Sequence, residues 1–295
     1  MAVVITNISY CPSSAEDKQR QFDIYYPGPS KSTEESQSQS SPSLICFIHG
    51  GAWRSEDKRN HEQTARNLVK ATGCPVAVPN YRLTPTNNTD PAFFHPMHVL
   101  DMLQFLSFIR GWKPAPNSNG AGANANATVN FALDPNSLIL LGHSCSAHML
   151  ASVFLHNPDS RLAPSPELAS AVKAIVFSEG IFDIDLLLAR FPDYRGWFIE
   201  AAFGAAPSFD EYSVVKYPLL SRGSSSPISW LVLHSKGDTL VDQSQSDAMF
   251  AHLLDITGPE NVSLDVDNLK EEHNDILVTE TYANLVGDFV KKHVH

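Results

Sequence analysis

A serine stands between small residues at positions 142–146, where the sequence reads Gly-His-Ser-Cys-Ser. A short apolar run at 137–141 precedes this motif, and a stretch at 147–155 with helical character follows it. A tight turn from a buried strand into a helix projects the hydroxyl of its central residue away from the sheet, while small neighbours allow close packing. This context makes Ser144 the candidate nucleophile. Ser146 stands where such turns usually carry glycine, but it keeps the position small.

A glycine pair lies in a second motif, His-Gly-Gly-Ala-Trp at 49–53, directly after the apolar run 44–48. Glycines allow the backbone to approach a substrate closely, so that its N–H groups can bind the negative charge that develops on an attacked carbonyl oxygen. We expect the N–H groups of Gly51, Ala52 and Cys145 to be the donors, with Gly50 shaping the turn. The thiol of Cys145 is not the expected nucleophile, because the turn exposes Ser144. The expected oxyanion and substrate-binding residues here are Gly50, Gly51, Ala52, Cys145 and Trp53.

A nucleophilic serine needs a base, and the base needs an acid that orients it. Enzymes that carry the serine on this kind of turn place the acid next along the chain and the histidine last. Asp238 follows the apolar run 228–234 on a turn, which makes it the expected acid. Asp242 is the rival four residues later, and we interpret it as the cap of the next helix. Asp183 is a more distant candidate.

The expected base is His273, which lies in the polar loop 271–275 between the last apolar run and the final helix. The other histidines near or beyond Asp238 are at the end of a strand, within a helix or in the terminal tail: His234, His252, His293 and His295. We interpret His49 and His143 as structural residues that order their turns. No metal is expected, since the histidines lack the H-x-x-x-H and H-E-x-x-H spacings of metal sites.

Short apolar runs alternate with helical patterns along the chain, which predicts a mainly parallel sheet in a single α/β domain over residues 1–295. We expect a flexible connection at about 29–43, a low-complexity loop at about 113–130 and a small helical cap at about 185–220. The cap region is rich in aromatic residues, among them Trp197, which could stack on an aromatic substrate. The expected strands are 5–10, 20–26, 44–48, 75–79, 137–141, 172–177, 228–234 and 262–266. The expected helices are 62–71, 96–110, 147–155 and 276–293.

The chain has 295 residues, a length that one large domain can reach, and a formal net charge of −11. An acidic chain offers no basic surface for nucleic acid or for an anionic membrane. Its four cysteines are scattered, which favours buried free thiols. With no signal-peptide pattern at the N-terminus, we expect a cytoplasmic protein. The expected partner is a small-molecule substrate without a cofactor, and the pattern leaves a monomer and a homodimer both open.

Taken together, the motifs at 49–53 and 142–146 resemble the α/β-hydrolase superfamily, from about residue 23 to the end of the chain. Within it, the sequence is most similar to fungal kynurenine formamidases (arylformamidases). Further runs that carry this resemblance are Ala-His at 147–148, Ser-Glu-Gly-Ile-Phe-Asp at 178–183, Phe-Pro-Asp-Tyr at 191–194 and Ala-Phe-Gly at 202–204. The resemblance implies an α/β-hydrolase fold and metal-free hydrolysis of N-formyl-kynurenine to kynurenine and formate, in tryptophan degradation. It implies catalytic roles for Ser144, Asp238 and His273.

Two other interpretations remain open at this point. A carboxylesterase for small aromatic or secondary-metabolite esters would use the same triad, so the motifs do not separate it from a formamidase. A non-enzymatic binding protein on the same scaffold is disfavoured, because such proteins normally lack a triad member and this chain carries all three.

Overall fold

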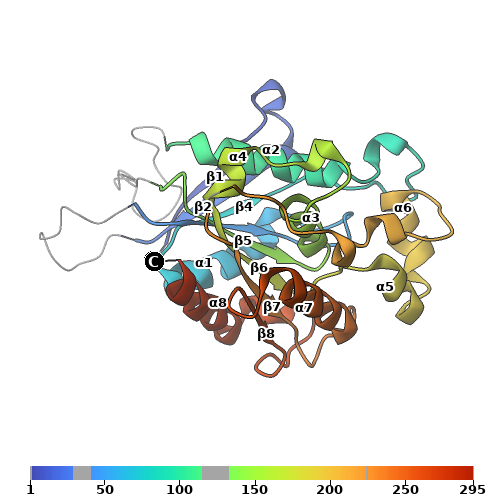
Figure 1. Ribbon diagram of the computed structural model, residues 1–295. Helices are drawn as coiled ribbons and strands as arrows, with labels where there is room; N and C mark the ends of the chain where they lie inside the picture. The colour runs from blue at the N-terminus through green and yellow to red at the C-terminus, as the bar shows by residue number, and fades with distance from the viewer. Residues whose placement is uncertain (1, 29–40, 115–132, 224, 295) are drawn as a thin grey trace, which may run out of the picture.

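The computed structural model describes residues 2–28, 41–114, 133–223 and 225–294. Most of the expected connection at 29–43 and of the expected loop at 113–130 lies outside these residues. The described chain forms one eight-stranded sheet in the order β1-β2-β4-β3-β5-β6-β7-β8, with helices on both faces (Figure 1). The strands β4, β3, β5, β6, β7 and β8 run parallel to one another. The strand β1 pairs antiparallel with β2, and β2 pairs antiparallel with β4. The prediction of a mainly parallel α/β sheet is confirmed.

The strands lie close to the apolar runs that predicted them. Their bounds are β1 Val3–Ser9, β2 Gln21–Tyr26, β3 Leu44–Ile48, β4 Val76–Pro79, β5 Leu138–His143, β6 Val172–Ser178, β7 Ser229–Leu233 and β8 Val262–Asp265. The central strands β3 and β5 are buried at every position, which explains why they read as continuous apolar runs. The strand β8 stands at the edge of the sheet.

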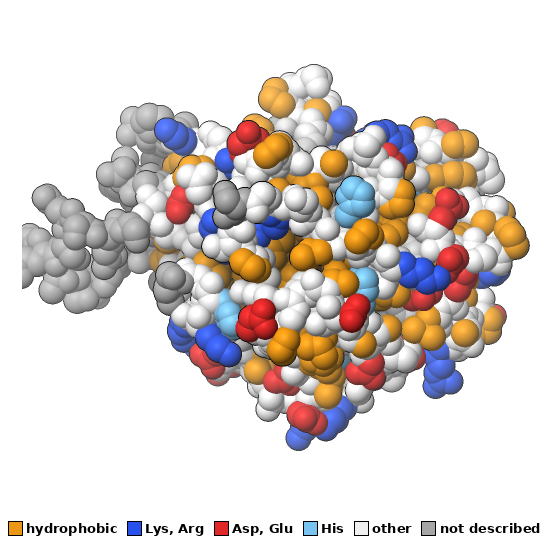
Figure 2. All heavy atoms as spheres, in the orientation of Figure 1, with side chains coloured by type: hydrophobic (Ala, Val, Ile, Leu, Met, Phe, Trp, Pro, Cys, Tyr) orange, Lys and Arg blue, Asp and Glu red, His pale blue; other side chains and the backbone are white. Residues whose placement is uncertain are grey.

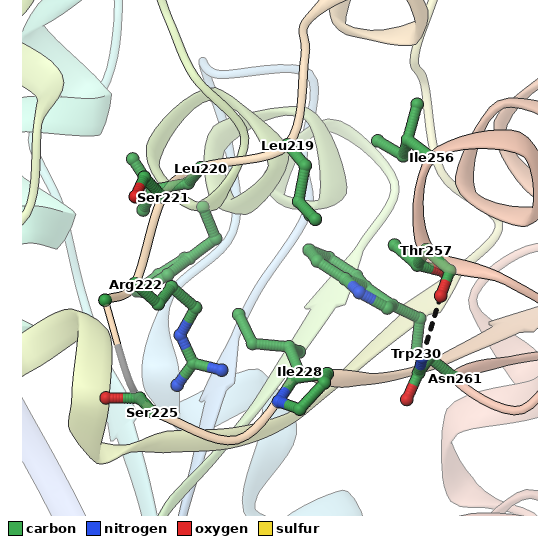
Figure 3. Close-up of a pocket in the computed structure, with 13 residues that line it drawn as sticks. Leu219, Leu220, Ser221, Arg222, Ser225, Ile228, Trp230, Ile256, Thr257 and Asn261 are labelled. Atoms are coloured by element: carbon green, nitrogen blue, oxygen red, sulfur yellow. Dashed lines mark hydrogen bonds between the residues drawn. The ribbon is translucent and has the colours of Figure 1, made fainter.

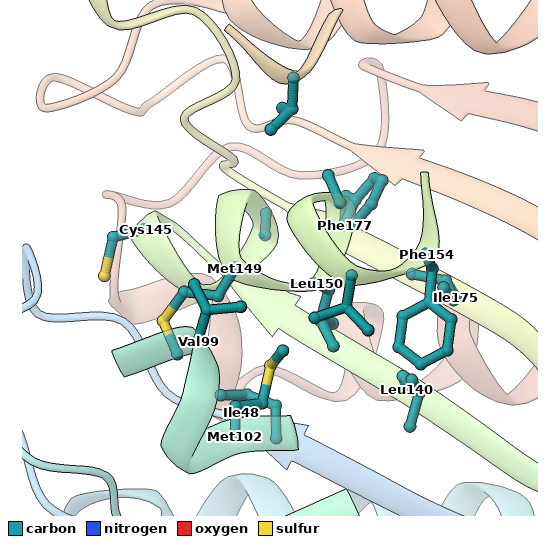
Figure 4. Close-up of a cluster of buried hydrophobic side chains, with 14 of the residues drawn as sticks. Ile48, Val99, Met102, Leu140, Cys145, Met149, Leu150, Phe154, Ile175 and Phe177 are labelled. Atoms are coloured by element: carbon teal, nitrogen blue, oxygen red, sulfur yellow. The ribbon is translucent and has the colours of Figure 1, made fainter. Parts of the chain in front are cut away.

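Eight α-helices surround this sheet in the described residues. They are α1 Glu62–Thr72, α2 Met97–Gly111, α3 Cys145–Phe154, α4 Pro166–Ala171, α5 Ile184–Arg190, α6 Glu200–Phe203, α7 Gln243–Thr257 and α8 Glu280–His293. One apolar cluster packs the sheet against α2, α3 and α7, and a second packs its other face against α1 and α8. Figure 4 shows part of the first cluster, in which Val99 and Met102 of α2 pack with Met149 and Leu150 of α3.

The start of the last helix differs from the expected range of 276–293. A short 3-10 turn covers Asp275–Val278, and α8 begins only at Glu280. The hydroxyl of Thr279 accepts a hydrogen bond from the backbone N–H of Tyr282, which is the bond of a helix N-cap. The apolar residues of the 3-10 turn continue the spacing of a helix, which is why the predicted helix began at residue 276. The N-cap at Thr279 sets the actual start of α8.

The predicted cap region consists of short pieces rather than long helices. It contains α5, a π-helical turn Arg195–Ile199, α6 and two 3-10 turns, Asp210–Tyr212 and Val214–Lys216. In Figure 1, α5 and α6 lie to the right of the sheet. The strands β3 and β5 begin on the left, so α5 and α6 lie toward the carboxyl ends of the parallel strands. The carboxyl ends of such strands are where open α/β sheets bind ligands.

On the face that Figure 2 shows, acidic and basic side chains are interspersed rather than gathered by sign. The four cysteines, Cys11, Cys46, Cys74 and Cys145, are all free and buried. Among the described residues, every helix is too short or too polar to cross a lipid bilayer.

Candidate active site

Ser144 occupies the turn between β5 and α3, with φ 57° and ψ −124°. A left-handed backbone at a residue other than glycine is strained, and such strain is found where a fold holds a residue in place for function. The close packing of the turn explains Gly142, because a Cβ there would lie 2.9 Å from both the nitrogen of Ala147 and the carbonyl oxygen of Ser146. The structure therefore has the strand-turn-helix geometry that the sequence predicted around Ser144.

Ser146 stands where the usual motif has glycine, and its side chain is fully buried and hydrogen-bonded. Its hydroxyl lies 2.6 Å from the carbonyl oxygen of Ile48, to which it donates, and accepts from the backbone N–H of His143 at 2.8 Å. Ile48 is the last residue of β3, immediately before the glycine loop. The extra hydroxyl thus joins the serine turn to the strand that carries that loop.

The glycine loop has three successive residues with positive φ: 96° at Gly51, 52° at Ala52 and 58° at Trp53. A Cβ on Gly50 would lie 2.9 Å from the Cβ of Ser144, so only glycine allows this loop to approach the serine so closely. The phenol of Tyr81 donates to the carbonyl of Gly50 at 2.8 Å and holds the loop from behind. The structure brings the loop and the serine together as the sequence predicted.

Cys145 joins the loop to the serine turn through its side chain. Its sulfur accepts a hydrogen bond from the backbone N–H of Trp53, with an N–S distance of 3.3 Å. Burial raises the pKa of the thiol to about 11, so it stays protonated near neutral pH and is a poor nucleophile. Cys145 is also the first residue of α3, where backbone N–H groups have no partner within the helix. The oxyanion contact expected of its N–H stays a prediction.

Asp238 and His273 meet in a short hydrogen bond, in which Nδ1 of the imidazole lies 2.7 Å from Oδ2 of the carboxylate. The other carboxylate oxygen, Oδ1, accepts from the backbone N–H groups of Leu240 at 2.8 Å and Val241 at 3.0 Å. Burial alone would raise the pKa of Asp238, but its hydrogen bonds, first of all the one to His273, leave that pKa below its usual range. The carboxylate is therefore ionised and fixes the imidazole with Nδ1 protonated.

The loops that carry this pair are tied to each other. A Cβ on Gly237 would lie 2.2 Å from the carbonyl oxygen of Lys270, so glycine is required for the two loops to touch. The hydroxyl of Ser235 donates to the carbonyl of Glu271 at 2.6 Å, and that of Thr239 donates to the carboxylate of Glu272 at 2.8 Å. These contacts set the position of Asp238 relative to His273.

The rival acids have other partners. Asp242 is the N-cap residue of α7, as expected, although its carboxylate accepts from the hydroxyl of Ser244 rather than from a backbone N–H. Asp183 caps α5, where its carboxylate accepts from the N–H of Leu186 at 3.0 Å. The other downstream histidines are also engaged: His234 with Ser246, His252 with the carbonyl of Tyr217 and His293 with Ser229. His295 lies outside the described residues.

Ser144 and His273 are both nearly buried, with 6% and 5% of their surface exposed. In the described part of the chain, the Ser144 hydroxyl has no hydrogen-bond partner. The imidazole of His143, the neighbour of Ser144, packs on that of His273 with ring centres 4.6 Å apart. Burial, followed by the nearby His273, holds the pKa of His143 well below its usual range. A neutral His143 at this contact agrees with its interpretation as a structural residue, and the serine turn lies next to the base.

The neighbouring turn histidine, His49, is equally buried. Burial lowers its pKa to about 4, helped by His61, and its ring stacks on Tyr81 at 4.5 Å. A neutral, stacked imidazole agrees with the structural role that the sequence predicted for it.

The cap contacts both the glycine loop and the acid loop. The guanidinium of Arg54 donates to the carbonyl of Trp197, and the phenol of Tyr194 donates to the carbonyl of Leu240 at 3.1 Å. Trp197 is 55% exposed on its π-helical turn, so its indole is free to contact a ligand. Trp53, by contrast, is fully buried and packs edge-to-face on Phe203. It supports the loop from behind, and a direct substrate contact by Trp53 stays a prediction.

Glu179 is a further residue of this site, outside the set of site residues expected from the sequence. It follows β6 directly, is fully buried and has a positive φ of 53°. One oxygen of Glu179, one oxygen of Asp238 and one ring nitrogen of His273 all lie within 4.8 Å of one another. Its signal in the sequence is an ionisable side chain in an otherwise small or apolar turn, between Ser178 and Gly180, directly after an apolar run.

A cavity of about 260 Å³ lies elsewhere, between the end of α3, the start of β7 and the end of α7 (Figure 3). Trp230, the second residue of β7, lines it, whereas Asp238 follows the opposite end of that strand. The Arg222 guanidinium beside it donates to the backbone carbonyls of Ala169 and Val172. These bonds hold the segment before β7 in place, so we regard the cavity as a structural feature rather than part of the site.

Comparison with known proteins supports the fold. Residues 45–183, from β3 through the turn after β6, match the family model described as alpha/beta hydrolase fold. The protein has the α/β-hydrolase fold. Solved structures share it over almost the whole chain: esterase B from Lactobacillus rhamnosis has a TM-score of 0.67 at 16% identity, covering 99% of this chain and 84% of that chain. A truncated carbohydrate esterase from gut microbiota has a TM-score of 0.67 at 19% identity, covering 98% and 95%.

Among proteins of described function, this α/β-hydrolase-fold chain is similar to fungal kynurenine formamidases. It is 27% identical over 226 residues to the kynurenine formamidase of Eremothecium gossypii, covering 73% of this chain and 80% of the relative. It is 23% identical to the kynurenine formamidase of Scheffersomyces stipitis, covering 74% and 80%. A kynurenine formamidase-like hydrolase of Fusarium equiseti is 25% identical, covering 72% and 71%.

Proposed function

We propose that this protein is a serine hydrolase that removes a small acyl group, with N-formyl-kynurenine as its substrate and kynurenine and formate as its products. The observation that carries the proposal is the 2.7 Å hydrogen bond between His273 and Asp238, beside a strained serine turn. The similarity to fungal kynurenine formamidases supports the substrate.

In the proposed first step, His273 takes the proton of the Ser144 hydroxyl through Nε2 while the serine oxygen attacks the formyl carbon. Asp238 holds Nδ1 and stabilises the imidazolium that forms. The hydrogen bond between the Ser144 hydroxyl and Nε2 of His273 forms when substrate binds, since catalytic hydrogen bonds often tighten only in the substrate complex. The oxyanion accepts hydrogen bonds from the N–H groups of Gly51, Ala52 and Cys145, each such donor contributing on the order of 3 kcal/mol to the barrier reduction.

In the second step, His273 returns the proton to the aniline nitrogen as the carbon–nitrogen bond breaks and kynurenine leaves. A water molecule then attacks the formyl group on Ser144, again with His273 as base, and formate is released. The buried position of Ser144 suits a small acyl group, and we expect the exposed indole of Trp197 to contact the aromatic leaving group.

The experiment compares hydrolysis of N-formyl-kynurenine with that of p-nitrophenyl acetate by the wild-type protein and by Ser144→Ala. The proposal requires a much higher kcat/KM for the formamide and no activity of the variant on either compound. Cleavage of the ester alone, lost in Ser144→Ala, would replace the formamidase by a carboxylesterase with the same triad. Full activity of the variant would overturn the serine mechanism itself.

A further inference from the structure

The carboxyl group of Glu179 lies in the same buried site as the Asp238–His273 pair, although the mechanism assigns it no step. Its Oε1 accepts a hydrogen bond from the backbone N–H of Ser235 at 2.8 Å. Its Oε2 is buried without any hydrogen-bond donor within reach among the described residues. A buried oxygen without a donor is unfavourable if it carries negative charge, but a protonated oxygen can itself donate.

One oxygen of Asp238 lies within 4.8 Å of one oxygen of Glu179, and the two carboxyl groups share a side-chain hydrogen bond. Two buried carboxyl groups this close do not both ionise, because the negative charges repel and neither is well solvated. The negative charge is more stable on Asp238, because its carboxylate accepts hydrogen bonds from His273, Leu240 and Val241. Among the residues that the structure describes, Glu179 accepts a hydrogen bond only from the N–H of Ser235. Burial, followed by the hydrogen bond to Asp238 and its charge, accordingly raises the pKa of Glu179 well above its usual range.

The other titratable groups around Glu179 do not supply a positive charge that would ionise it. From the end of β7, His234 approaches Oε2 at 3.6 Å, but burial lowers its pKa and its Nδ1 also meets Ser246. From α8, Tyr282 contributes a phenol that bonds to Ser178, and burial raises the pKa of that phenol. His273 is already engaged with Asp238.

The backbone holds the Glu179 side chain in this position. The residue has φ 53°, in the region that favours glycine, and its N–H donates to the carbonyl of Leu233 at 3.1 Å. The next residue must be glycine, because a Cβ on Gly180 would lie 2.2 Å from the ring of Phe182. A glutamate kept at a strained position beside the acid indicates a role for its side chain.

We propose that Glu179 is a neutral carboxylic acid that donates its proton in a hydrogen bond to Asp238 and so positions that carboxylate against His273. Glu179 is thus a positioning residue of the proposed triad, on whose function this inference rests. The expected consequence is that the site depends on a hydrogen-bond donor at position 179 and not on a negative charge there.

Two variants separate these roles. Glu179→Gln keeps both a donor toward Asp238 and an acceptor for the N–H of Ser235, so we expect kcat within about threefold of wild type. The acid limb of the kcat/KM profile should not move, since one neutral group replaces another. Glu179→Ala removes the donor and should lower kcat by roughly 10–100-fold with little change in KM. Asp242→Asn, an acid-to-amide change nearby, serves as the control and should alter neither quantity.

Two kinetic results would overturn the proposal. If Glu179 were ionised, Glu179→Gln would remove a negative charge near His273 and shift the acid limb to lower pH by about one unit or more. Equal losses of activity in Glu179→Gln and Glu179→Ala would show that a donor at this position does not suffice.

A measurement that needs no activity tests the proton directly. Unfolding exposes Glu179 to water, where it ionises above about pH 4.5, so unfolding of the wild type releases its proton and unfolding of Glu179→Gln does not. As the pH rises from about 5 to about 8, the Tm of Glu179→Gln should therefore increase relative to the Tm of the wild type. A constant Tm difference would overturn the protonated carboxyl even if the protein proved inactive on every substrate. If the protein hydrolysed no substrate but the Tm difference still grew with pH, the proposed function would be wrong. The protonated state of Glu179 would then still be supported.

Discussion

The hydroxyl of Ser146 lies 2.6 Å from the carbonyl oxygen of Ile48 and donates a hydrogen bond to it. This bond ties the start of α3, just after the serine turn, to the end of β3, from which the glycine loop departs. The two halves of the candidate site come from chain segments almost a hundred residues apart. The residue that departs from the usual serine motif is therefore one that fixes how those halves meet.

Replacing Ser146 by alanine removes this bond and leaves the backbone N–H of His143 without its acceptor. We expect the free energy of unfolding to fall by about 1–3 kcal/mol, since a buried donor without a partner carries that cost. Urea unfolding at neutral pH measures the change. Ser107→Ala, on the exposed side of α2, is the control and should stay within about 0.5 kcal/mol of wild type. Equal stability of the two variants would show that the buried bond contributes little.

Replacing Asp238 by asparagine should reduce kcat by roughly 10³–10⁴-fold on whichever substrate the wild type cleaves, because the amide no longer holds His273 in the required tautomer. Asp242→Asn should keep nearly full activity, since its carboxylate contacts Ser244 rather than His273. Steady-state kinetics of the two variants separates the acids. A severe loss in Asp242→Asn with an active Asp238→Asn would reverse the assignment.

Buried neutral histidines should make the fold sensitive to acid. Burial depresses the pKa of several histidines, among them His49, His95, His98, His143 and His148. The unfolded chain binds protons at these groups below about pH 6.5, while the folded chain does so only at much lower pH. Their contribution to stability is thus complete above about pH 6.5 and is lost as the pH falls, by up to about 1.4 kcal/mol per pH unit for each group. Denaturant unfolding between pH 7 and pH 5 should show a fall of several kcal/mol. A constant free energy of unfolding over this range would contradict the prediction.

Trp197 should affect substrate binding more than stability. Its indole is 55% exposed, on a turn that Arg54 links to the glycine loop. We expect Trp197→Ala to raise KM for an aromatic substrate by about tenfold, as the loss of one aromatic contact predicts, with a much smaller effect on an acetate ester. Leu254→Ala, an exposed apolar change on α7, is the control and should leave both KM values unchanged. Equal KM values for Trp197→Ala and wild type would place the aromatic contact elsewhere.

Much of this site could be predicted from the sequence because its parts are local. The serine turn and the glycine loop each consist of a few consecutive residues, whose small side chains signal close packing. The order of the chain then limits the acid and the base, and the structure brings Asp238 and His273 into contact. Glu179 could not be placed in the same way, because its role depends on how the turn after β6 meets the loop after β7. The predicted start of the last helix, at residue 276, was also wrong. The apolar residues of the 3-10 turn continue the helical pattern, but α8 begins only after the Thr279 cap.

The proposed function depends on attack by the Ser144 oxygen on an acyl carbon, with His273 as its base. Covalent trapping examines this step: a fluorophosphonate is incubated with the wild type, Ser144→Ala and His273→Ala, and the labelled peptide is located by mass spectrometry. We predict one adduct per chain, on Ser144, with no labelling of Ser144→Ala and strongly slowed labelling of His273→Ala. An adduct on Cys145 or at a distant residue, or unchanged labelling of the Ser144→Ala protein, would contradict the claim.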